Sequence, residues 1–73
     1  MTAPPIANQI RRLRFDHGEM TQEALAQACS VTRQTIIAIE QGRYSPSLEV
    51  AFRISHALRA PLDEVFDYPK EES

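Results

Sequence analysis

The chain has few of the features that mark secreted, membrane or disulfide-bonded proteins. Its single cysteine, Cys29, cannot form an internal disulfide, which agrees with a reducing compartment. No apolar run approaches the roughly 20 residues of a membrane-spanning helix. The first ten residues, MTAPPIANQI, lack the basic and apolar regions of a signal peptide. We therefore expect a cytoplasmic protein that does not enter a membrane.

Glycine is also scarce, with two residues in 73, whereas isoleucine, leucine, valine and alanine are spread along the chain. This composition favours a compact helical unit over a disordered chain. The length leaves no room for a separate sensor or catalytic domain, so we expect a single domain over residues 1–73. A core of this size rarely supplies more than about 3–5 kcal/mol, and dimerisation would supplement it.

The net charge of −2 is unusual for a nucleic-acid-binding protein, but it is unevenly distributed. Residues 1–60 carry seven arginines against five acidic residues, and residues 61–73 carry one lysine against five acidic residues. Arginine is suited to bidentate contacts with phosphate and guanine. This asymmetry fits a protein in which residues 1–60 bind an anion and the acidic residues 61–73 point away from it. A solvated surface with an acidic end fits equally well, so charge alone does not decide.

Apolar spacing and capping residues predict five helices without repeats or a linker. The first helix includes Ile6 and ends before Gly18, and Thr21 caps the second. In the fourth helix, Ser45 is the predicted cap and Pro46 the first helical residue. The predicted helices span residues 6–17, 22–29, 33–41, 46–59 and 62–66.

The third of these segments contains the run Ile36–Ile39, which is rich in β-branched residues and open to an alternative interpretation as a strand. Thr32 before the run and Gly42 after it are typical of the two ends of a helix. These two signals favour the helix.

The second and third helices are separated by only a few residues, so they must cross steeply, as in a helix-turn-helix. Counted from Gln22, the fifth residue is Ala26, which is small enough for the close approach of the two helices. The apolar residues that the arrangement needs inside are also present, although a generic helical hairpin is the alternative. They are Leu25, Cys29, Val31, Ile36 and Ile39. Ala28 shares the apolar side of the second helix, and Thr32 lies on the inward side of the third helix with Ile36 and Ile39.

The segments MTQEALAQACSVTRQTIIAIEQGRYSPSLEVAFRISHAL and PLDEVF resemble the Xre family of helix-turn-helix regulators, which includes phage lambda repressor and Cro. The resemblance covers residues 6–67 and leaves residues 68–73 as an acidic tail. It implies an all-α, five-helix fold, sequence-specific binding to double-stranded DNA, and a homodimer on a palindromic operator. It implies no cofactor.

In such proteins the third helix, here residues 32–41, presents its N-terminal residues to the major groove. Arg33 can pair bidentately with guanine, and Gln34 with adenine. Ile37 faces outward, where it contacts a thymine methyl group or, alternatively, packs against a partner subunit. The resemblance also implies base reading at the position of Ala38, which offers little beyond a methyl contact.

DNA phosphates are predicted at the ends of these helices. Gln22 opens the second helix, where free N–H groups and the helix dipole favour an anion. The resemblance implies that this glutamine clamps the DNA backbone and that the loop after the third helix adds further contacts. The predicted phosphate contacts are Thr21, Gln22, Thr32, Arg43, Tyr44 and Ser47.

The family also pairs a glutamate at the position of Glu40 with an arginine four residues before a glycine, here Arg14. The resemblance therefore implies a partly buried structural ion pair, and two separate surface charges are the alternative. Three features depart from the family pattern. The loop RYS after the third helix carries one arginine, where relatives can be richer in lysine. Ser30 replaces the usual turn glycine, at a cost of about 1 kcal/mol or more if it is left-handed, and Glu19 is an extra residue before the second helix.

The remaining functional side chains are expected to be structural. We interpret Cys29 as a small buried hydrophobe rather than a redox sensor. His17 and His56 have no partners at metal-ligand spacing, so no metal site is expected. Phe15 and Phe52 are expected in the core or an interface. No nucleophile–base pair is evident, so we do not expect an enzyme or a small-molecule effector.

A homodimer is predicted through the C-terminal region. Phe66, Tyr68 and Pro69 lie past the DNA-reading helices, where a two-fold interface leaves both third helices free. The leading hypothesis is a transcriptional regulator, most simply a repressor that occupies a promoter. The alternative is a protein-interaction module, such as an antitoxin or an anti-repressor partner, that uses the same fold.

Overall fold

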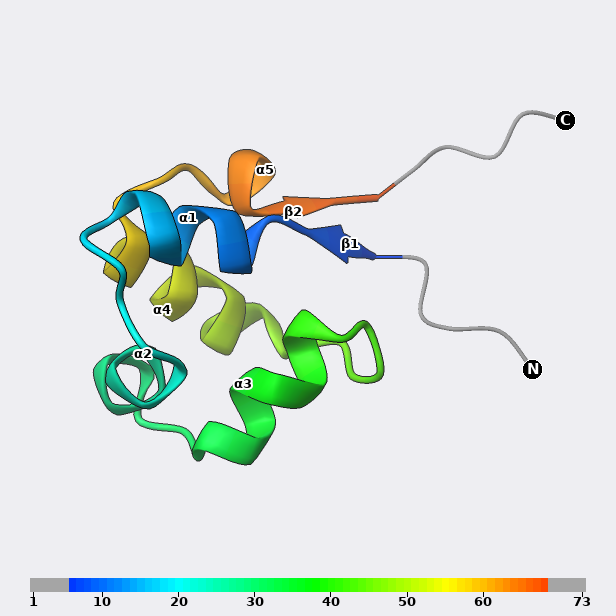
Figure 1. The fold of residues 1–73 in the computed structure, drawn as a ribbon. Helices are drawn as coiled ribbons and strands as arrows, with labels where there is room; N and C mark the ends of the chain where they lie inside the picture. The colour runs from blue at the N-terminus through cyan, green and yellow to red at the C-terminus, as the bar shows by residue number, and fades with distance from the viewer. Residues whose placement is uncertain (1–5, 69–73) are drawn as a thin grey trace, which may run out of the picture.

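The computed structural model describes residues 6–68 and shows a small all-α fold, as the sequence predicted (Figure 1). Within these residues, five helices surround one core and a two-stranded ribbon lies beside them. The helices are α1 (Ile10–Asp16), α2 (Gln22–Cys29), α3 (Arg33–Glu40), α4 (Leu48–Leu58) and α5 (Leu62–Val65). None of them is long and apolar enough to cross a lipid bilayer.

The ribbon joins the two ends of the described chain and was not predicted. Strand β1 (Ala7–Asn8) pairs antiparallel with β2 (Phe66–Asp67), and Asn8 lies opposite Phe66. The first helix therefore begins at Ile10 and not at Ile6. A two-residue strand has no alternation that a sequence pattern can reveal, and its partner lies at the other end of the chain.

The core is formed by the inward faces of all five helices. α4 runs through the middle and packs against α1, α2 and α5, as Figure 1 shows. On α2 the buried alanine is Ala26 and not Ala28, which is exposed. The fully buried large side chains are Ile10, Leu25, Ile36, Ile39, Ile54 and Val65.

The start of α4 differs from the prediction. Its N-cap is Ser47, whose Oγ accepts a hydrogen bond from the Val50 N–H at 3.3 Å. The predicted cap, Ser45, lies two residues earlier, and Pro46 precedes the helix instead of opening it. Both serines are good capping residues, so the local sequence offered two starting points that only the packing of α4 distinguishes.

Two of the three phenylalanines are not in the core. Phe15 is 66% exposed and Phe52 is 44% exposed, so of their two expected locations, core or interface, the structure excludes the core, and the interface stays a prediction. Phe66 is half buried and packs against the core from β2. Helical spacing places Phe15 and Phe52 on the shoulders of their helices, where a small core does not reach them.

Candidate nucleic-acid interface

Three residues connect α2 to α3 and make the sharp turn between them. Ser30 is left-handed, with φ 60° and ψ 40°. The N–H groups of Ser30 and Val31 donate to the Gln27 and Ala26 carbonyls at 3.2 and 3.0 Å, which ends α2. Ala26 is 2% exposed. The small side chain and the left-handed residue together allow the steep crossing of a helix-turn-helix.

The first turn of α3 is held by Thr32. Its Oγ1 accepts a hydrogen bond from the Thr35 N–H at 3.1 Å. Thr32 is exposed, although the helical wheel placed it inward. The wheel does not apply to an N-cap residue, because its backbone is extended, here with φ −82° and ψ 158°. Ile36 and Ile39 do face the core, with exposures of 0% and 1%.

The outer face of α3 begins with two unpaired polar side chains. Arg33 and Gln34 are exposed, and neither side chain forms a hydrogen bond or ion pair within residues 6–68. Ile37, which was expected to be fully outward, is half buried, as is Ala38. The outer face of α3 therefore carries long, exposed polar side chains at its N-terminal end and half-buried apolar side chains in its middle.

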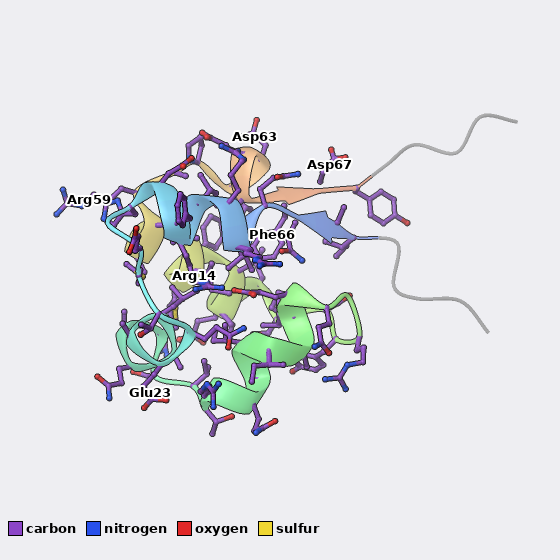
Figure 2. All side chains as sticks on the ribbon, viewed as in Figure 1. Arg14, Glu23, Arg59, Asp63, Phe66 and Asp67 are labelled. Atoms are coloured by element: carbon purple, nitrogen blue, oxygen red, sulfur yellow. The ribbon has the colours of Figure 1, made fainter. Side chains whose placement is uncertain are left out.

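An ion pair fixes α3 to α1. The Arg14 Nε lies 2.6 Å from the Glu40 Oε2, and the Arg14 Nη2 donates to Oε1 at 3.2 Å. Both side chains are largely covered, with 14% and 9% exposed. The Gln22 Nε2 also donates to the Glu40 Oε1 at 3.2 Å. One carboxylate thus joins α1, α2 and α3, and Figure 2 shows Arg14 in the gap between α1 and α3.

Three of the predicted DNA contacts line one groove between α1, α2 and α3. They are Thr21, Gln22 and Arg33, and the same groove contains Arg11 and Gln41. Thr21 caps α2, with its Oγ1 accepting from the Ala24 N–H at 2.9 Å. Sequence reasoning missed Arg11 and Gln41. No sequence signal distinguishes Arg11 from Arg12, because both arginines are expected at solvent-exposed positions of the same short helix.

Three further predicted phosphate contacts, Arg43, Tyr44 and Ser47, lie in the segment that follows α3. Gly42, with φ 76°, follows the helix, and Arg43 is exposed, with its Nε donating to the Gln41 Oε1 at 2.8 Å. Tyr44 is 51% exposed, and Ser47 caps α4. These side chains do not line the groove that contains Thr21 and Gln22. Apart from Thr32, which caps α3, the predicted phosphate contacts therefore form two groups, one in the groove beside α3 and one in the segment between α3 and α4.

The arginines divide into compensated and uncompensated ones. Arg12, Arg14 and Arg53 each lie within 4.0 Å of a carboxylate. The other four form no ion pair within the described part of the chain. Of these, Arg59 ends α4 on the side away from α3 (Figure 2). The remaining three are at or beside the two ends of α3: Arg11, Arg33 and Arg43.

Cys29 is fully buried at the end of α2. Burial raises the pKa of its thiol, and the nearby Arg53 guanidinium lowers it to a smaller extent. A thiol with a raised pKa carries little thiolate at neutral pH, which makes it a poor redox sensor. Among residues 6–68, no three side chains of histidine, cysteine, aspartate or glutamate are grouped so as to hold a metal ion.

The residues predicted for the dimer interface are only partly described. Tyr68 is 66% exposed, whereas Phe66 packs against its own core. Both border a shallow groove beside α5 and the ribbon, together with Ile6 and Leu62. Pro69 lies outside the described residues.

Comparison with known proteins identifies the class. A model of the helix-turn-helix family matches residues 10–65. An uncharacterised HTH-type transcriptional regulator of Methanocaldococcus jannaschii is 43% identical over 65 residues, which cover 89% of this chain and 97% of that protein. A second such regulator, from Methanothermobacter thermautotrophicus, is 55% identical over 58 residues, which cover 78% of this chain and 83% of the relative.

Two solved structures share the fold. The clp gene regulator ClgR of Corynebacterium glutamicum is 34% identical, with a TM-score of 0.68, and the match covers 73% of this chain and 55% of that one. The restriction-modification controller protein C.AhdI of Aeromonas hydrophila is 29% identical, with a TM-score of 0.69 and coverages of 75% and 82%.

The chain therefore belongs to the helix-turn-helix family, as its resemblance to Xre-type regulators predicted. It is a DNA-binding transcriptional regulator rather than an enzyme.

Proposed function

We propose that the protein binds a palindromic operator in double-stranded DNA as a homodimer, with α3 in the major groove, and represses transcription by occupying a promoter. The observation that carries the proposal is the state of Arg33 and Gln34. Both are exposed on the first turn of α3, and neither is engaged by another side chain within residues 6–68. Side chains that read base edges need this freedom, because a donor already paired within the protein must break that bond first.

In this proposal Arg33 pairs with guanine and Gln34 with adenine. Ile37 and Ala38, half buried in the middle of α3, form a low apolar surface that suits thymine methyl groups. The long side chains of Arg33 and Gln34 then extend to the base edges. The short side chains in the middle of α3 contact the DNA only where α3 lies close to the floor of the major groove.

Phosphates bind on both sides of α3. The hydroxyls of Thr21, Thr32 and Ser47 each accept a backbone N–H at a helix start. A hydroxyl that accepts in this way can still donate its own hydrogen to a phosphate oxygen. The Thr32 Oγ1 also lies 3.0 Å from the Thr35 Oγ1, and Thr32 keeps its hydrogen for a phosphate when the Thr35 hydroxyl is the donor in that bond. Gln22 uses one amide hydrogen for Glu40 and retains a second for DNA. Arg43 and Tyr44, in the loop after α3, bind phosphates of the other DNA strand.

The dimer forms through the C-terminal end of the described chain. The groove beside the ribbon supports this, because the apolar residues Ile6, Leu62 and Phe66 and the exposed ring of Tyr68 line it, together with Asp63 and Asp67. Pro69, in the acidic tail that follows, belongs to the proposed interface from the sequence alone. A two-fold axis there presents two copies of α3 to half-sites about 34 Å apart, one helical turn of DNA.

Selection of bound duplexes from a random pool, at a stated salt concentration, tests the proposal. We expect an enriched palindrome with two half-sites, and sedimentation of the selected complex as two chains per duplex. Enrichment of no sequence, together with binding that does not depend on salt, would favour the protein-interaction module instead.

A further inference from the structure

We propose that Arg11, on α1, binds a backbone phosphate of the DNA strand that passes over the groove between α1, α2 and α3. This inference rests on the proposed function and extends the DNA interface beyond the helix-turn-helix to the first helix. In this proposal Arg11 binds a phosphate, whereas Arg12, the next residue of α1, does not.

The groove brings three elements to one place. α1 contributes Arg11, α2 contributes Gln22, and Arg33 stands on the first turn of α3. Gln41, directly after α3, lines the same groove. The groove therefore follows one flank of α3 from its first turn to its end. A DNA strand that borders the major groove runs beside an inserted helix, so the phosphates of that strand meet the groove when Arg33 reads a base.

The charge of the groove favours an anion. Its lining contains three arginines and two glutamates, a net charge of +1 on a protein whose net charge is −2. Arg14 and Glu40 compensate each other at 2.6 Å. The charges that remain are those of Arg11 and Arg33 against the carboxylate of Glu23.

The hydrogen-bond partners indicate which side chains are available. Arg11 is exposed and has no ion pair or side-chain hydrogen bond among residues 6–68. The planar guanidinium of arginine offers paired donors that match two oxygens of a phosphate. Among residues 6–68, the Glu23 carboxylate accepts one hydrogen bond, from the Gln27 amide at 3.3 Å, and its charge opposes a phosphate in the groove. Figure 2 shows Glu23 on α2, below the gap that Arg14 occupies.

The next residue of α1 provides a matched control. Arg12 is on the same helix and carries the same charge, but its Nη1 lies 3.3 Å from the Asp16 Oδ2 and its Nη2 lies 4.0 Å from the Glu64 Oε2. It does not line the groove beside α3. If Arg11 acts only through the net charge of the protein, Arg11→Gln and Arg12→Gln should lose the same DNA affinity. If Arg11 contacts a phosphate directly, only Arg11→Gln should lose affinity.

The experiment uses the full chain and two duplexes, the selected operator and a scrambled one, across a series of salt concentrations. We expect Arg11→Gln to weaken binding to both duplexes about tenfold and to lower the slope of log affinity against log salt by about 0.9. Arg11→Lys should retain the wild-type slope. Arg12→Gln should match the wild type. Glu23→Gln should strengthen binding to both duplexes severalfold, a gain that impaired folding cannot produce.

Equal losses in Arg11→Gln and Arg12→Gln would overturn the inference, as would an Arg11→Gln loss confined to the selected duplex or an unchanged affinity in Glu23→Gln. These outcomes leave the proposed function intact. If the wild type binds neither duplex in a salt-dependent way, the proposed function itself fails. Thermal unfolding of Arg11→Gln should match that of the wild type, because Arg11 has no partner within the described protein.

Discussion

Arg14 and Glu40 are 26 residues apart in the chain, yet the Arg14 Nε and the Glu40 Oε2 lie 2.6 Å apart. The same guanidinium donates to the Met20 carbonyl at 2.7 Å, so it also holds the segment that leads into α2. The pair therefore sets the position of α3 relative to the first two helices, and through it the direction in which Arg33 and Gln34 project.

Removing either partner should destabilise the protein. We expect Arg14→Ala and Glu40→Ala each to lower the free energy of unfolding by about 3 kcal/mol, because each leaves a partly buried charge without its partner. The double variant should lose at least about 1 kcal/mol less than the sum of the two. Urea unfolding measures all three. The exposed Arg53–Glu49 pair has the same 2.6 Å separation and should show a coupling of only about 0.3–0.5 kcal/mol. Additive losses at Arg14 and Glu40 would contradict the structural role.

Ser30→Gly should stabilise the protein. Ser30 is left-handed with φ 60°, a conformation that costs a residue with a Cβ about 1 kcal/mol relative to glycine. We expect the free energy of unfolding to rise by about that amount. Ser45→Gly, at a serine outside the left-handed region, should bring no gain, because there glycine only adds freedom to the unfolded chain. A loss of stability in Ser30→Gly would show that the turn does not favour glycine.

The two serines before α4 should differ in importance. Ser47→Ala removes the acceptor for the Val50 N–H and should cost about 1 kcal/mol. Ser45→Ala should change the stability by less than about 0.5 kcal/mol. Chemical denaturation of both variants measures the difference. A larger loss of unfolding free energy in Ser45→Ala would show that Ser45, the cap predicted from the sequence, is the N-cap of α4.

Base reading and phosphate binding should be separable on the two sides of α3. Arg33→Ala should weaken the selected operator by about 1–3 kcal/mol and leave a random duplex nearly unchanged. Arg43→Ala should weaken both duplexes alike and reduce the salt slope. Fluorescence titration at several salt concentrations measures both effects. Equal losses of Arg33→Ala on the two duplexes would remove it from the base-reading residues.

The buried thiol should make the stability sensitive to alkaline pH. The pKa of Cys29 is raised in the folded protein, mainly by burial, so the unfolded chain loses this proton first as the pH rises. Stability attributable to the thiol is therefore full below about pH 8.5, the usual pKa of cysteine, and falls above it. Cys29→Ala should be less stable at pH 7 but should lose less stability between pH 8 and pH 10. Parallel curves for the two proteins would exclude this contribution.

The sequence alone determined the helix-turn-helix itself. Thr21 and Thr32 were predicted as caps from residue type and position, and both accept the expected backbone N–H. The buried positions Ile36 and Ile39 followed from helical spacing. These features are local, because a cap acts within four residues and an amphipathic helix repeats every few residues, so the chain states them without reference to distant parts.

Only the tertiary structure decided which of several equivalent residues lies where. It joined β1 to β2, chose Ser47 over Ser45 as the cap of α4, and placed Arg11 in the groove while Arg12 met Asp16. In each case the local preferences of the alternatives are nearly equal. The outcome depends on contacts between segments far apart in the chain, which exist only after the helices have packed.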